Sequence, residues 1–175
     1  VKKCDIKLFK NKRRSGIKAI NIANDKLVDV ILNNGQDILI ASKLGFAVRF
    51  KSDKVRTMGR NATGVRGIRL RANDKALTIS NVDKEYILTI TENGYGKLTD
   101  TNEYRITNRG GKGIINIKVG EKNGMVVGSA CVSADQEIIL FSKNGLAERI
   151  SIKDISKFRR ASIGVRLMRL EPNDK

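Results

Sequence analysis

Short apolar segments alternate along the chain with longer polar connections. Residues 38–42 (ILIAS) and 46–50 (FAVRF) are rich in branched or aromatic residues and flank KLG. This pattern is typical of two strands joined by a tight turn. Residues 76–82 (ALTISNV) predict another strand, whereas the polar and basic residues 51–63 indicate a long connection. Long helical periodicity appears nowhere, so the pattern predicts an all-β protein.

Two motifs repeat in step along the chain. The first is a glycine followed by spaced apolar residues, as in NATGVRGIRL and ASIGVRLMRL, and the second is a glycine in a hairpin turn, as in ILTITENGYGKL. The first motif contains Gly16, Gly64, Gly113 and Gly164, and the second contains Gly45, Gly94 and Gly145. Both have a period near fifty residues, which predicts propeller-like blades of about four strands. The expected repeats are 1–47, 48–95, 96–146 and 147–175, about three and a half in all.

The stretch GVRGIRL at 64–70 is expected to be a strand that begins at a glycine where a Cβ would be obstructive. Its apolar residues Val65, Ile68 and Leu70 should face the core, and its arginines should point elsewhere. The first three residues, VKK, are matched to VRF at 48–50 and to ERI at 148–150, so the chain is expected to begin inside a hairpin.

The chain carries a net charge of +17, and the excess of basic residues is spread over all the repeats. This distribution favours a folded basic surface that faces a polyanion; a surface tuned only for solubility is the alternative. Cations recur just ahead of the glycine of the first motif in every repeat. Arginines also cap strands and pack along carbonyls, but four repeats in register favour a stripe that faces a ligand.

Nucleic acid is the expected polyanion. Aromatic residues make up 5% of the chain and tryptophan is absent, whereas single-strand binding usually relies on stacking rings. Phe46 and Tyr95, at equivalent hairpin turns, are expected to pack internally. The composition suits phosphates of a duplex held by charge. The candidate DNA-binding residues are Lys12, Arg13, Arg14, Lys43, Lys54, Arg56, Arg60, Arg66, Arg109, Lys112, Lys143, Lys157, Arg159 and Arg160.

The sequence offers no catalytic set, metal site or cofactor motif. The chain has no histidine and two distant cysteines, Cys4 and Cys131, which argues against zinc and predicts buried, reduced thiols of a cytosolic protein. GGKG at 110–113 lacks the spacing of a phosphate-binding loop. No apolar run is long enough to span a membrane.

The motifs VRTMGRNATGVRGIRL, ILTITENGYGKL and EYRITNRGGKGIINIKVGEKNGMVVG closely resemble the C-terminal domain of the bacterial DNA gyrase A subunit. The resemblance covers essentially the whole chain. It implies a β-pinwheel, a propeller-like disc, usually of six blades, in which neighbouring blades exchange a strand. The chain would be a later part of such a disc.

The resemblance also implies a function. The basic outer rim would bind and wrap duplex DNA without sequence preference. It would support negative supercoiling together with two partners, the ATPase subunit of gyrase and the N-terminal cleavage region of the same polypeptide. The domain itself would be non-catalytic; Tyr86, Tyr95 and Tyr104 are poor candidates for a DNA-cleaving residue. A cytoplasmic, nucleoid-associated bacterial protein is expected.

One departure from the family pattern concerns its signature box, of the form Gln-Arg-Arg-Gly-Gly-Arg/Lys-Gly. TNRGGKG at 107–113 lacks the Gln-Arg start of this box. It is therefore interpreted as an ordinary connection between blades. The alternative functions are the related domain of topoisomerase IV, a propeller that binds proteins, and a basic RNA-binding β-domain.

Overall fold

The computed structural model describes residues 1–11, 14–172 and 174–175. Its helices within these ranges are four short 3-10 turns: η1 (Ile6–Phe9), η2 (Ser52–Lys54), η3 (Thr101–Glu103) and η4 (Ile152–Asp154). The strands are β1 (Asp37–Ser42), β2 (Phe46–Lys51), β3 (Ala76–Val82), β4 (Tyr86–Thr91), β5 (Tyr95–Asp100), β6 (Ile114–Ile115), β7 (Val126–Val132), β8 (Glu137–Phe141), β9 (Ala147–Ser151) and β10 (Val165–Arg166). The predicted all-β class is confirmed.

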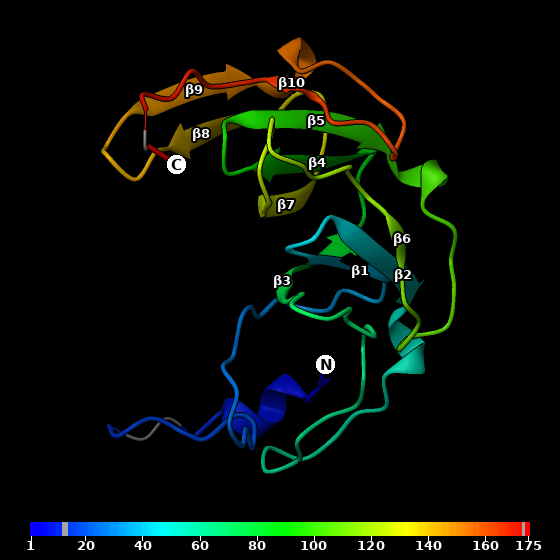
Figure 1. Cartoon of the computed structure of the whole chain (residues 1–175). Coiled ribbons are helices and arrows are strands. Elements are labelled where there is room, and N and C mark those ends of the chain that lie inside the picture. The colour runs from blue at the N-terminus through cyan, green and yellow to red at the C-terminus, as the bar shows by residue number, and fades with distance from the viewer. Residues whose placement is uncertain (12–13, 173) are drawn as a thin grey trace.

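The strands form two four-stranded sheets and one hairpin. The sheets have the orders β3-β1-β2-β6 and β10-β5-β4-β7, and β8 pairs with β9. The hairpin expected at 38–50 and the strand expected at 76–82 are both present. Figure 1 shows the sheets following an arc, with β3 and β7 on its inner side and β6 and β10 on its outer side.

The outermost strand of each four-stranded sheet comes from the following repeat. We call the segments after β2, β5 and β9 connections; they cover residues 52–75, 101–125 and 152–175. Strand β6, in the connection after β5, pairs with β2 through Ala47 and Ile114. Strand β10, in the connection after β9, pairs with β5 through Gly96 and Val165. These two connections therefore each add a strand to the preceding sheet before the chain continues into its own blade. This is the strand exchange of a β-pinwheel.

The first connection makes the same contact with the start of the chain. The Val65 N–H donates to the Val1 carbonyl over 2.8 Å, so Val1 occupies the place of Ala47 and Gly96. The match of residues 1–3 to 48–50 was therefore wrong by one residue, and the correct match is 47–49. The sequence could not reveal this shift. The contact that sets the match is the one between Val1 and Val65, and the glycine motif that contains Val65 lies some sixty residues further along the chain.

The stretch GVRGIRL does not form a regular strand. The reason is that its backbone bonds are divided between two partners: Val65 bonds to Val1, whereas Gly67 and Arg69 bond to Gly110 and Gly111 of the next connection. Val65 and Ile68 pack against the core as expected, and Arg66 and Arg69 are exposed. Leu70 was expected in the core but is 39% exposed.

We call the part of each connection that begins at the motif glycine and contacts the preceding hairpin an exchanged segment. That glycine is required by two constraints. Gly64, Gly113 and Gly164 have φ of +98°, +71° and +78°, a region that favours glycine. A Cβ would also lie 2.5, 2.7 and 2.5 Å from the carbonyl oxygens of Val1, Ala47 and Gly96. The close approach of two backbones explains the expected obstruction.

The side-chain volumes of the exchanged segments complement those of the residues that they contact. A Cβ at Gly67 would lie 2.7 Å from a Val1 methyl, and a Cβ at Gly96 would lie 2.5 Å from a Leu167 methyl. Glycine thus faces a large side chain in both contacts, on opposite partners. The exchanged segment is in each case shaped for the sheet that receives it.

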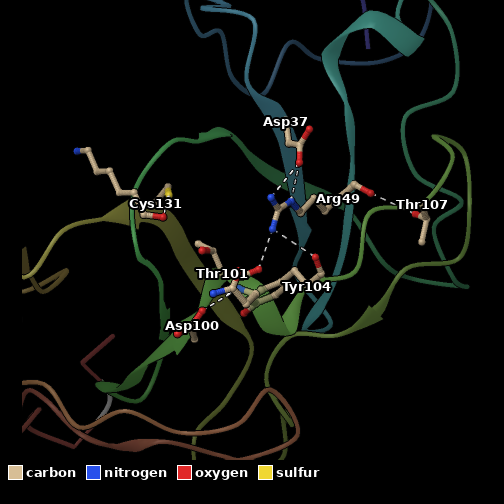
Figure 2. A network of polar contacts seen from close by, with 9 residues as sticks. Asp37, Arg49, Asp100, Thr101, Tyr104, Thr107 and Cys131 are labelled. Carbon is tan, nitrogen blue, oxygen red and sulfur yellow. Dashed lines mark hydrogen bonds and ion pairs between the residues drawn. The ribbon is translucent and has the colours of Figure 1, made fainter.

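Buried polar contacts join neighbouring sheets. Figure 2 shows Arg49 of β2 between the Asp37 carboxylate, 2.9 Å away, and the carbonyls of Thr101 and Tyr104 in the next repeat, at 2.8 and 3.4 Å. The Tyr104 hydroxyl donates to Asn116, which donates to Thr89. These contacts fix the second sheet against the first.

Both cysteines are free thiols, but each is half-buried, contrary to the expected full burial. Burial raises the pKa of the Cys131 thiol. Of the two rings expected to pack internally, Tyr95 is buried, whereas Phe46 is half-buried and the Arg71 guanidinium covers its ring at 3.2 Å from its centroid.

Candidate nucleic-acid interface

The three connections, together with residues 14–21, lie side by side on the outer side of the arc. Backbone bonds run from Asn21 to Ala62 (3.2 Å), from Arg69 to Gly111 (2.8 Å) and from Lys118 to Ser162 (2.9 Å). In each bond the N–H belongs to the residue five positions after the motif glycine of one repeat. The carbonyl belongs to the residue two positions before the motif glycine of the next repeat. We call the resulting surface, residues 14–21, 56–71, 105–118 and 156–170, the connection band.

One arginine recurs at the same place in three repeats of this band. Arg60, Arg109 and Arg160 each lie four residues before the motif glycine. Their Nη1 atoms donate to the carbonyls of Lys18, Arg66 and Ile115, at 3.5, 3.2 and 2.8 Å. These acceptors also share one place, two residues after the preceding glycine. The three arginines, which we call connection arginines, thus link neighbouring segments of the band and are half-buried.

This geometry refines the expectation drawn from the sequence. The equivalent cations are Arg60, Arg109 and Arg160, and the neighbours Lys112 and Arg159 occupy other positions. The packing of arginine along carbonyls, considered as an alternative, is present in all three repeats. The recurrence therefore has a structural cause in addition to any ligand contact.

The other candidates divide by exposure and place. Six candidates are exposed in the band: Arg14, Arg56, Arg66, Lys112, Lys157 and Arg159. Lys54 is exposed in η2. Lys43, half-buried, and Lys143, exposed, lie in hairpin turns and outside the band. Lys12 and Arg13 lie outside the described residues. The structure thus brings most, but not all, of the candidates together.

Sequence reasoning missed a second set of cations in the band. These exposed residues lie two or five positions after the motif glycine, and they are Lys18, Arg69, Lys118, Arg166 and Arg169. Counting from the glycine would have found them, because the same two positions are basic in several repeats. With them, the band presents exposed positive charge in every repeat.

Few carboxylates neutralise this charge. The ion pairs within the described ranges are Arg49–Asp37, Arg149–Glu137 and Lys175–Glu92, and none involves an exposed cation of the band. Two band cations contact tyrosines instead: Lys157 donates to the Tyr86 hydroxyl over 2.6 Å, and Arg166 to Tyr95 over 3.2 Å. The surface can therefore attract a polyanion without first breaking ion pairs.

A buried lysine supports one loop of the band from beneath. Lys97 of β5 is fully buried, and its Nζ donates to the carbonyls of Arg159 and Arg160, both at 2.8 Å. Burial lowers the pKa of Lys97 to about 8; the Glu103 carboxylate opposes this shift and Arg160 adds to it. Lys2, at the equivalent place in the first repeat, donates to the Arg60 carbonyl.

Other chemistry finds little support in the described part of the chain. It contains no group of three or more His, Cys, Asp or Glu residues that could hold a metal ion. Tyr104 is buried, and burial raises its pKa well above the usual value. None of the helices described is long and apolar enough to cross a membrane.

Comparison with known proteins identifies relatives of the whole chain. The family described as DNA gyrase C-terminal domain, beta-propeller, matches residues 1–34, 36–83, 85–133 and 136–175. The DNA gyrase A subunit of Haloquadratum walsbyi is 40% identical over 99% of this chain and 21% of its own length. That of Staphylococcus aureus is 40% identical over 97% of this chain and 20% of its own length. The chain thus spans about a fifth of the relatives it matches.

Two solved structures share the fold. A DNA gyrase A C-terminal domain has a TM-score of 0.84 and 30% identity, covering 92% of this chain and 56% of that domain. A C-terminal domain of DNA topoisomerase IV has a TM-score of 0.91 and 26% identity, covering 98% of this chain and 55% of that domain.

Proposed function

Because this chain belongs to the DNA gyrase C-terminal domain family, we propose that its connection band binds duplex DNA and bends it around the outer side of the arc. The observation that supports this proposal is the continuity of the band. Backbone bonds join the four segments of the band, and each segment presents exposed cations. A duplex that follows the band meets positive charge in every repeat.

The contacts available are of the kind that hold phosphates. Arginine and lysine side chains on a convex surface neutralise backbone charge and release counterions, which gives affinity without reading the sequence. The band has no exposed tryptophan or row of rings for base stacking. Duplex DNA is therefore preferred over single strands.

Within a larger enzyme, the bent duplex would be presented to the DNA-cleaving region of the same polypeptide with a fixed handedness. The ATPase subunit would then supply the energy for negative supercoiling. We infer this role, and a place in the cytoplasm at the nucleoid, from the gyrase subunits that the chain resembles along about a fifth of their length.

A domain of topoisomerase IV is the second candidate, because that solved domain has the higher TM-score. The sequence relatives named above are gyrase subunits, and the gyrase domain has the higher identity. Fusing this chain to a gyrase core and to a topoisomerase IV core separates the two: negative supercoiling should return only with the gyrase core.

The direct test is binding of a fluorescent duplex as a function of salt, with end-to-end energy transfer on the same duplex. If about six to ten phosphates are contacted, affinity should fall roughly 10³- to 10⁵-fold between about 50 and 200 mM salt. Scrambled duplexes should bind equally, and energy transfer should rise on binding. A flat salt response, or stronger binding to structured RNA or heparin, would contradict the proposal.

A further inference from the structure

We propose that Lys97, although fully buried, is a positioning residue for DNA binding: it holds the loop at residues 158–160 so that Arg159 projects from the connection band. This inference rests on the proposed function. It concerns a residue that cannot touch DNA itself, because its side chain is enclosed beneath the loop.

The loop is anchored from the preceding repeat by several bonds. Lys97 Nζ donates to the carbonyls of Arg159 and Arg160, both at 2.8 Å. The Thr99 hydroxyl donates to the Phe158 carbonyl over 2.9 Å, and the Arg160 N–H donates to the Glu103 carboxylate over 3.1 Å. Three consecutive residues of the loop are thereby fixed by side chains of β5 and η3.

The side chain of Arg159 is left free by this arrangement. It is exposed, and within the described ranges it has no hydrogen bond or ion pair to another side chain. Its own carbonyl is held by Lys97 and by the Ser162 hydroxyl, at 2.8 and 2.9 Å. A fixed backbone beneath a free guanidinium lowers the entropy lost when that guanidinium meets a phosphate.

A lysine suits this place because two carbonyls converge on one point. An ammonium group has three donors and no acceptor, so it can satisfy both carbonyls. A buried ammonium is costly unless it is hydrogen-bonded, which explains why the carbonyls and Lys97 occur together. Lys2 repeats the arrangement beneath the loop of Arg60, donating to the carbonyls of Arg60 and Ala19.

The neighbouring repeat shows that the fold accepts an apolar residue at this place. Val48 occupies it in β2 and is buried in the core. The loop above Val48 is held differently: Arg109 Nε donates to the Lys54 carbonyl over 2.9 Å. Replacing Lys97 by methionine should therefore preserve the fold while removing the two bonds that hold the carbonyls of Arg159 and Arg160.

The experiment compares Lys97→Met, Arg159→Ala and the double variant with the wild-type chain. Duplex affinity is measured from about 50 to 200 mM salt, and thermal unfolding checks that each variant is folded. Loss of one phosphate contact lowers the salt slope by about one unit, which corresponds to about tenfold weaker binding near 100 mM salt. Arg159→Ala should show this loss, Lys97→Met should show part or all of it, and the double variant should lose no more than Arg159→Ala.

Lys26→Met is the matched control, since Lys26 is exposed outside the band and its loss changes the net charge equally. It should change affinity by less than about twofold, as expected of a charge that contacts no phosphate. Full affinity in folded Lys97→Met, or additive losses in the double variant, would overturn the positioning role. Absence of DNA binding by the wild type would instead defeat the proposed function.

Discussion

At Gly164 the backbone leaves room for a hydrogen atom and for nothing larger. A Cβ there would lie 2.5 Å from the Gly96 carbonyl oxygen, whereas a Cβ at Gly145 would meet no atom within 4 Å. Both glycines have positive φ, +78° and +92°. They therefore separate the cost of backbone conformation from the cost of a steric clash.

We expect Gly145→Ala to lower the free energy of unfolding by about 1 kcal/mol, from the left-handed backbone alone. Gly164→Ala should cost about 2–4 kcal/mol, because the exchanged strand must also move away from β5. Urea denaturation of the two variants measures the difference. Equal costs would show that the close approach to Gly96 does not matter for stability.

The titration of Lys97 gives a second expectation for a single residue. Its pKa is about 8 in the folded protein, against about 10.4 in an unfolded chain. Between these values the unfolded chain binds more protons at this residue, so the free energy of unfolding rises with pH. Wild type should gain on the order of 1–2 kcal/mol over Lys97→Met between about pH 7.5 and 9.5.

Urea denaturation of both proteins at the two pH values provides the measurement. The difference between them isolates Lys97, because other titrating groups, including the half-buried N-terminal amine with its lowered pKa, are shared. Identical pH dependence in the two proteins would mean that Lys97 has an ordinary pKa when folded.

The sequence could identify residues that the backbone conformation requires, such as turn glycines. It could not identify residues whose burial or hydrogen-bond partners are unusual for their type. The turn glycine Gly45 was evident from its place between two apolar segments. Lys97 was not, because lysine is almost always exposed and its neighbours in β5 carry no sign of the loop above it. The bonds of the connection arginines also escaped detection, since their acceptors lie in another repeat, some 42 to 45 residues away.

At the scale of elements, the paired volumes at the exchanged contacts predict a coupling between two strands. Gly96→Val should clash with Leu167, whose methyl lies 2.5 Å from the place of the new Cβ. Leu167→Gly alone should leave a cavity. Together they recreate the Val1–Gly67 pair of the first repeat, so the double variant should cost about 1–3 kcal/mol less than the sum of the singles.

Urea denaturation of the two single variants, the double variant and the wild type completes this cycle. Additivity within about 0.5 kcal/mol would mean that the exchanged segment is not shaped for its host. The single variants serve as the controls, since each contains half of the rearrangement.

The hairpins could be predicted because alternation and turn glycines are local signals. Strand exchange could not be derived from the residues themselves, since the period shows that β6 exists but not which hairpin it joins. Only the family resemblance implied it. GVRGIRL was overestimated as a strand for a related reason: its pattern of apolar residues is that of a strand, but its backbone bonds are divided between Val1 and the next connection.

At the scale of the whole molecule, bending should depend on cations spread along the arc. Bending a duplex by tens of degrees costs on the order of 1–6 kcal/mol, which contacts in several repeats must offset. We expect a triple variant, Arg66→Ala, Lys112→Ala and Arg159→Ala, to keep residual binding but lose the bend. These residues belong to three successive connections and are exposed.

Energy transfer across a short labelled duplex, at saturating protein, measures the bend. The matched control is Lys26→Ala, Lys75→Ala and Lys153→Ala, which removes three exposed charges outside the band. Equal bending by the two triple variants would show that the band is not the bending surface.

The exchange of strands also determines when each sheet can be completed during synthesis of the chain. Strand β2 ends at residue 51, but its outer partner β6 begins at residue 114. At translation speeds of about 5–20 residues per second, the sheet built on β1 and β2 stays open at its outer edge for roughly 3–13 s. An unpaired edge is a template for pairing with other chains. A ribosome that pauses in this interval therefore holds a nascent chain exposed to aggregation, and each blade is completed only by its successor.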